Sequence, residues 1–163
     1  MKRIATILFA VAIVPAPLAL SADAPDKQGH EQHRHHEGRE AHAGHMLKGY
    51  LEVSGALSTD DLAAAKLAAA EMAEHDENSS LAKFAKALAK SKDIKAARGH
   101  FQDLSRAAID LAKSEKQNKY IVMHCPMVKD GRGDWLQIDT VVKNPYMGKK
   151  MLSCGGQKKR KKK

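Results

Sequence analysis

Residues 94–111 read IKAARGHFQDLSRAAIDL and have the strongest helical periodicity in the chain. Apolar side chains recur there at i, i+3, i+7, i+10, i+14 and i+17, so they lie along one face of a helix. They are Ile94, Ala97, Phe101, Leu104, Ala108 and Leu111. The stretch therefore predicts a long amphipathic helix whose apolar face must pack against other elements.

Three more helical segments precede this one. Helical spacing predicts helices over about 44–57, from the capping signal at 58–61 to about 74, and over 81–88. Ser91-Lys92-Asp93 is a further capping signal before the long helix. Short loops between such helices favour an antiparallel bundle. Because only 4% of the chain is aromatic and alanine is abundant, we expect small side chains at the helix contacts.

The pattern changes at Tyr120. Runs 120–123 and 135–138 favour strands, with a turn signal at 130–133 and another at Asn144-Pro145. A lone hairpin is marginal, so we expect Trp135 and Tyr146 to anchor it on the helices. The predicted fold is mainly α: an antiparallel helical bundle of about four helices with a small C-terminal β-hairpin and loop segment.

A sulfur-bearing motif lies at each end of this segment. His124-Cys125-Pro126-Met127 opens it and Met151-Leu152-Ser153-Cys154 closes it, with the only two cysteines of the chain. Thiolate and thioether ligands select Cu(I) over harder ions. The predicted ligands of a soft-metal site are His124, Cys125, Met127, Met151 and Cys154, with Met123 and Met147 as second-rank candidates.

The N-terminus resembles a secretory signal over residues 1–24. Lys2 and Arg3 precede an apolar run at 4–14, and small residues follow up to Ala24. The run is shorter than the roughly 20 apolar residues that cross a bilayer, and no other segment could span a membrane. We predict export to the periplasm; an uncleaved N-terminal anchor is the alternative. In an oxidising compartment Cys125 and Cys154 could instead form a structural disulfide.

The net charge of +9 does not indicate nucleic-acid binding. Lys2 and Arg3 and the basic tail at 157–163 hold eight of the 28 basic residues, which leaves 20 against 19 acidic ones. The remaining charges are interspersed and form no basic stripe. We expect a near-neutral domain over 44–156 that does not bind nucleic acid.

Residues 25–43 are polar and rich in histidine, which predicts a disordered linker. Neutral imidazole binds Cu(II), Zn(II) and Ni(II), so the segment is a candidate arm that captures Cu(II) or another divalent ion. The candidate ligands of this arm are His30, His33, His35, His36, His42 and His45. A flexible linker with incidental histidines is the alternative, and we interpret His75 and His100 as surface or capping residues.

The motifs HCPM, WLQ and NPYMGKKMLSCG, together with ARGHFQDLS at 97–105, resemble a bacterial family with a domain of unknown function, number 3347. The resemblance covers about 43–156. Members are small exported proteins, and the domain also occurs on CusB-type adaptors of copper and silver efflux systems. The resemblance implies a helical bundle, a Cys/Met segment and heavy-metal handling, without a catalytic activity.

The sequence therefore predicts a periplasmic protein that binds copper or silver for buffering, delivery or resistance, and is not an enzyme. Its expected partners are metal ions and an efflux adaptor or metallochaperone. The chain shows no Gly-rich phosphate loop, no nucleophile elbow, no C-x-x-C motif and no zinc-finger spacing. The alternative is a disulfide-stapled helical module that binds a protein partner such as an efflux adaptor.

Overall fold

The structure, a computed structural model, describes residues 28–159, and it describes residues 28–37 by their backbone alone. The predicted signal peptide, the first residues of the predicted linker and the end of the basic tail lie outside the described residues. No helix in the described part of the chain is long and apolar enough to cross a membrane.

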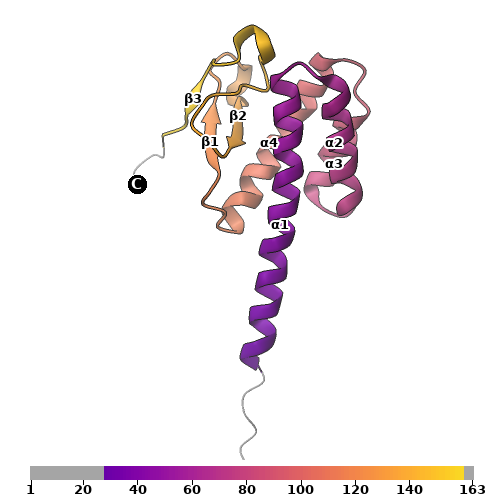
Figure 1. The fold of residues 1–163 in the computed structure, drawn as a ribbon, viewed down its shortest axis with the longest axis vertical. Helices are drawn as coiled ribbons and strands as arrows, with labels where there is room; N and C mark the ends of the chain where they lie inside the picture. Colours follow the sequence, from indigo (N-terminus) through magenta and orange to yellow (C-terminus); the bar gives the residue numbers. More distant parts are fainter. Residues whose placement is uncertain (1–27, 160–163) are drawn as a thin grey trace, which may run out of the picture.

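Within residues 28–159, four α-helices precede a small sheet. The helices are α1 (Gln28–Ser58), α2 (Leu62–His75), α3 (Ser80–Ala89) and α4 (Ile94–Ser114). The strands are β1 (Ile121–His124), β2 (Asp134–Gln137) and β3 (Gly156–Gln157), with short 3-10 helices η1 (Lys129–Gly131) and η2 (Gly148–Met151). Successive helices pack on one another, and Figure 1 shows them side by side with the sheet along one flank. The mainly helical fold prediction is confirmed.

Side-chain caps begin α2, α3 and α4, and those of α2 and α4 lie within the capping signals at 58–61 and 91–93. Asp61, Ser79 and Asp93 each accept a hydrogen bond from the backbone amide three residues later, at 2.9, 3.0 and 2.8 Å. Each such cap contributes about 1 kcal/mol to helix stability.

The apolar face of α4 lies in the centre of the core. Ala97, Phe101, Leu104 and Ala108 are fully buried, while the two ends of the predicted stripe are partly buried. The rings of Tyr50 on α1 and Phe101 stack with their centres 5.4 Å apart. Met46 and Met72 are also buried, as core residues rather than ligands.

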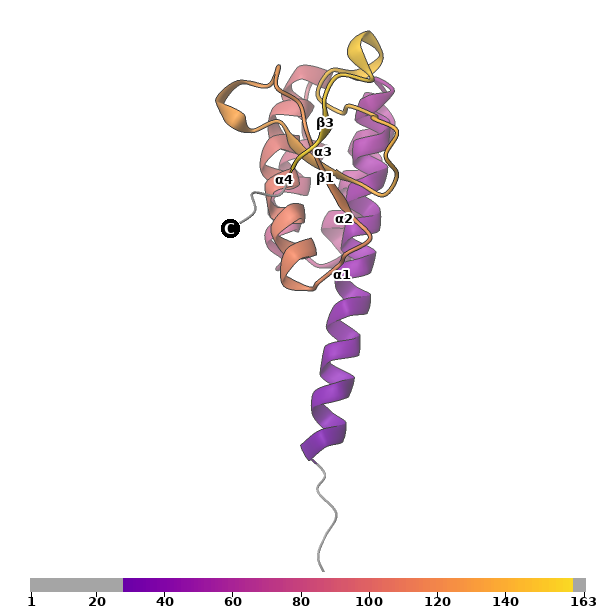
Figure 2. The same cartoon turned by 90° about the vertical axis from the view of Figure 1, so that its left-hand side faces the viewer.

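The predicted start of the first helix at Gly44 is wrong, because α1 begins at Gln28 and includes most of the expected linker. Ala43 is the first buried residue among those whose burial is described, residues 38–159. Figures 1 and 2 show the N-terminal part of α1 extending past the rest of the bundle. Adding a residue to an existing helix is far easier than nucleating one. This extension has no apolar stripe, so periodicity could not reveal it.

The sheet is antiparallel with strand order β2-β1-β3. Met123 lies opposite Trp135 in the predicted hairpin, and His124 lies opposite both Asp134 on β2 and Gly156 on β3. Figure 2, seen from the sheet side, shows the strands lying over the helices. Trp135 and Tyr146 are buried in the common core, as expected. The two-residue strand β3 was not predicted, and it brings the C-terminal end of the segment onto β1.

Candidate functional site

The fold brings the two cysteines together. Cys125 directly follows β1, and Cys154 lies just before β3, which pairs with β1. Their Sγ atoms are 3.8 Å apart, and both thiols are free. Cys125 is fully buried, whereas Cys154 is only partly buried, so the pair can be reached from one side.

The sulfur separation fits a shared metal ion. Two thiolates bound to one ion at about 2.3 Å lie roughly 3.8 Å apart when the angle at the metal is tetrahedral. A disulfide requires sulfur atoms about 2.05 Å apart, so the two Sγ atoms would have to move closer by more than 1 Å. Burial and the neighbouring Cys125 thiol raise the pKa of Cys154. A metal ion would therefore displace the proton of Cys154 when it binds.

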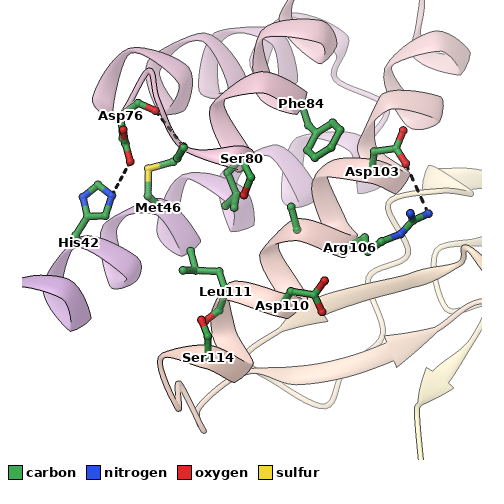
Figure 3. Close-up of a pocket in the computed structure, with 13 residues that line it drawn as sticks. His42, Met46, Asp76, Ser80, Phe84, Asp103, Arg106, Asp110, Leu111 and Ser114 are labelled. Carbon is green, nitrogen blue, oxygen red and sulfur yellow. Dashed lines mark hydrogen bonds and ion pairs between the residues drawn. The ribbon is translucent and has the colours of Figure 1, made fainter. Parts of the chain in front are cut away.

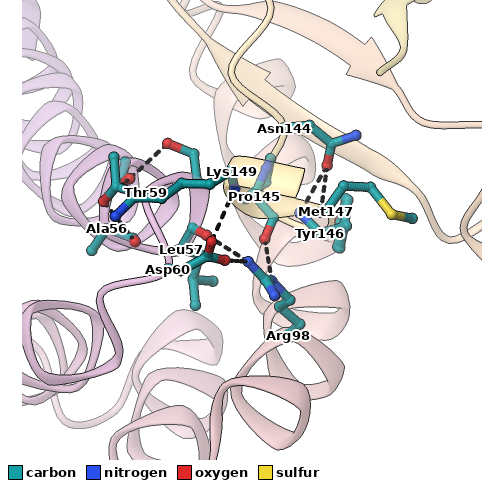
Figure 4. A network of polar contacts seen from close by, with 12 residues as sticks. Ala56, Leu57, Thr59, Asp60, Arg98, Asn144, Pro145, Tyr146, Met147 and Lys149 are labelled. Atoms are coloured by element: carbon teal, nitrogen blue, oxygen red, sulfur yellow. Dashed lines mark hydrogen bonds and ion pairs between the residues drawn. The ribbon is translucent and has the colours of Figure 1, made fainter. Parts of the chain in front are cut away.

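Asn144 holds the loop that carries Cys154. Its Nδ2 donates to the Cys154 carbonyl at 2.6 Å, and its backbone amide donates to the Leu152 carbonyl at 2.8 Å. Its Oδ1 accepts from the amides of Tyr146 and Met147 at 2.8 and 3.1 Å (Figure 4). Asn144 is fully buried, so these bonds are shielded from water. The sequence analysis identified Asn144 only as the start of a turn and missed this role.

An ion pair clamps the same loop to the helices. Arg98 on α4 donates to the carbonyls of Leu57 and Pro145 at 2.9 and 2.8 Å, and it pairs with Asp60 in the α1–α2 turn (Figure 4). The other carboxylate oxygen of Asp60 accepts from the Lys149 amide at 3.0 Å. The hydrogen bond from Arg98 holds the pKa of Asp60 below its usual value. Asp60 was predicted as part of a capping signal, but Asp61 is the cap.

Gly148 is required at the point where the clamp meets the loop. Its φ of +60° is one that residues with a side chain rarely adopt. A Cβ there would also collide with the Asp60 carboxylate and the Arg98 guanidinium. The glycine of the NPYMG sequence is therefore needed both for its backbone conformation and for its lack of a side chain.

A buried polar network fastens β2 to the bundle. Tyr50 accepts from the Leu136 amide at 3.1 Å and lies 2.8 Å from the Ser105 hydroxyl. Ser105 and Tyr146 both donate to the Asp134 carbonyl, at 2.8 and 2.6 Å. Burial raises the pKa of both tyrosines, so they remain neutral donors.

His124 directly precedes Cys125 in the chain. Burial alternates along the chain, so Met123 and Cys125 are buried while His124 is partly exposed. Its Nδ1 lies 2.7 Å from a carboxylate oxygen of Asp134, whose other oxygen pairs with Lys158. A carboxylate in this position fixes the orientation of a metal-binding imidazole and leaves Nε2 as the ligand atom.

The methionines of the predicted site occupy different environments. Met127 and Met151 are 59% and 40% exposed, so neither thioether is used as core filler. The second-rank candidate Met123 is buried in the core, and Met147 is packed against it. No group of three or more His, Cys, Asp and Glu side chains in residues 38–159 is arranged to hold a metal ion. Among the predicted ligands, the two cysteine thiols are thus the ones that the fold brings together.

The histidines of the predicted arm lie on α1. His30, His33, His35 and His36 belong to its helical backbone, but their side chains fall outside the described part. His42 and His45 are exposed and lie against the end of α2. His100 is exposed on α4, as interpreted from the sequence.

The fold and the site together define a class of protein: a small helical bundle whose C-terminal strands and loops bring two thiols together. A family model described as protein of unknown function (DUF3347) matches residues 46–120. This match confirms the resemblance over residues 46–120. The match covers the bundle and ends before the cysteine motifs. No curated protein and no solved structure matches the chain.

Proposed function

We propose that this protein binds Cu(I) or Ag(I) through Cys125 and Cys154 and serves in buffering, delivery or resistance. The 3.8 Å separation of the two Sγ atoms is the observation that supports this most strongly. Two thiols this close, contributed by separate loops, offer a soft ion the ligands that it prefers. Catalysis has no part in the proposal.

Other side chains of the two cysteine motifs offer further donors. His124 is oriented by Asp134, and Met127 and Met151 carry exposed thioethers in the same two motifs. Because Cu(I) accepts few soft ligands, one of these three added to the thiolates is enough. The arm on α1 would gather Cu(II) or another divalent ion.

The proposed location is the periplasm, based on the signal-like residues 1–24. An ion held there by a shielded thiolate pair could be passed to an efflux adaptor or a metallochaperone. Such an exchange would occur on the side of the site where Cys154 is partly exposed.

Titration of the reduced full-length protein with Cu(I) against a competing chelator tests the proposal. We expect one tightly bound ion per chain, and a dissociation constant at least 100-fold weaker in a Cys125→Ser/Cys154→Ser variant. Ser153→Ala is the matched control, because Ser153 is an exposed neighbour of Cys154. Equal affinities in all three proteins would overturn the proposed site.

The same sulfur pair supports a second candidate, a disulfide-stapled module that binds a protein partner. Apolar side chains on the C-terminal segment favour it, since Ile138, Val141 and Leu152 are exposed. A thiol count on protein taken from its native compartment separates the two functions. The metal-binding proposal predicts two free thiols, whereas the stapled module predicts none.

A further inference from the structure

Three histidines and one aspartate gather between α1 and α2. His42 and His45 lie one helical turn apart on α1, and His75 and Asp76 end α2. The ring of His75 stacks on His45 with a centre separation of 3.8 Å and lies 5.5 Å from the ring of His42. His42 Nε2 is 3.0 Å from Asp76 Oδ2.

Buried residues beside the cluster hold α1 and α2 together. Ala43, Met46 and Met72 are buried, and each lies within four residues of a histidine of the cluster. Gly49 lets α2 approach closely, because a Cβ there would lie 3.3 Å from the Met72 Cβ. The cluster is therefore held by core contacts about one turn away on each helix.

The side chains of the cluster have room to rearrange. All three histidines are exposed. Figure 3 shows His42 and Asp76 facing each other beside a cavity of about 590 Å³ that they line with Met46 and residues of α3 and α4. Rotation of an exposed imidazole about its side-chain bonds is fast and disturbs no core contact.

We propose that His42, His45, His75 and Asp76 bind one divalent ion of the zinc, nickel and copper(II) class. Imidazole and carboxylate are ligands that suit these ions, and three or four protein ligands make a stable site. The inference rests on the proposed function in one respect, that the arm on α1 collects divalent ions. It gives that arm an anchored site and adds two ligands from α2.

The distances between the imidazole rings show which side chains must move when the ion binds. Two imidazoles on one ion have ring centres roughly 5 Å apart at metal–nitrogen distances of 2.0–2.1 Å. The 5.5 Å separation of His42 and His75 is close to this value, but the two rings are stacked at 18° and do not point at a common ion. The 3.8 Å separation of His45 and His75 is too short, and in these positions the four residues are not arranged to hold an ion. The three rings therefore turn out of their stacks when the ion binds.

Zinc titration of the full-length chain carrying Cys125→Ser and Cys154→Ser tests the site without the thiols. We expect His75→Ala to weaken the tightest zinc dissociation constant at least tenfold, because the arm alone cannot replace this ligand. His100→Ala, an exposed histidine on α4, is the control and should leave the value within twofold. Equal zinc binding in the His75→Ala and His100→Ala proteins would overturn the inference.

Side-chain NMR of the protein carrying Cys125→Ser and Cys154→Ser gives a second measurement that needs no histidine variant. The first equivalent of zinc should shift the ring signals of His42, His45 and His75 and leave those of His100 in place. Unchanged His75 signals at full zinc loading would contradict the proposed ligand set. Neither result depends on Cu(I) affinity, so the failure of this site and the failure of the thiol site are distinguishable.

Discussion

At the scale of single residues, Asn144 decides where Cys154 lies. One buried amide group bonds both the carbonyl of Cys154 and the two amides that follow Pro145. A buried side chain with this many bonds leaves several unpaired backbone groups when it is removed, and each costs about 1–3 kcal/mol.

We therefore predict that Asn144→Ala lowers the free energy of unfolding by about 2–3 kcal/mol. It should also weaken Cu(I) binding about tenfold, because the Cys154 loop loses its anchor. Urea unfolding and chelator competition measure the two effects. Asn118→Ala, at an exposed loop residue, is the control. A variant as stable as that control would show that Asn144 does not hold the loop.

Gly148 gives a second prediction at this scale. Gly148→Ala should cost about 2 kcal/mol or more, because strained backbone and a collision with the Asp60–Arg98 pair add together. Gly131 also has a positive φ, of 66°, but a Cβ there meets nothing within 4 Å. Gly131→Ala therefore measures the backbone strain alone. Thermal unfolding measures the loss of stability in each variant. Equal losses in the two variants would rule out the collision.

At the scale of elements, the Asp60–Arg98 pair joins three parts of the chain: the α1–α2 turn, α4 and the loop before η2. The cysteine loop thus rests on the bundle through polar contacts in addition to its buried tyrosine. The exposed position of Asp60 keeps the net contribution of the ion pair small.

This pair makes stability depend on pH. The pKa of Asp60 is lowered in the folded state, so its ionised form stabilises the fold above the unfolded pKa of about 4. The contribution is lost as the pH falls through the lower folded pKa. Asp60→Asn should therefore be less stable than the wild type at pH 7, with the difference shrinking in acid. Urea unfolding of both proteins at pH 7 and in acid measures the difference in their free energies of unfolding. A difference that does not change with pH would exclude this account.

At the scale of the whole molecule, the bundle could be predicted from the sequence because its signals are local. The stripe on α4 and the caps at Asp61, Ser79 and Asp93 each depend on residues within one or two turns. The extension of α1 and the short strand β3 could not be predicted from the sequence, because neither has a periodic apolar pattern.

The candidate site, like the fold, could be predicted from the sequence only in part. The sulfur motifs are visible in the sequence, but the approach of Cys125 to Cys154 depends on the pairing of β1 with β3. The roles of Asn144, Asp60 and Arg98 follow from contacts between distant segments, which no local pattern encodes. His75 is exposed in the last turn of α2, in line with its interpretation as a surface or capping residue. Its approach to His42 and His45 could not be predicted, because they lie thirty residues or more away on α1.

The central claim is that the folded chain presents Cys125 and Cys154 as a joint ligand pair for a soft metal ion. X-ray absorption at the copper edge of the reduced, Cu(I)-loaded protein tests this most directly. We predict a first shell dominated by sulfur, with at least two sulfur neighbours that are lost in the Cys125→Ser/Cys154→Ser variant. A first shell of nitrogen and oxygen alone in the wild type would contradict the account.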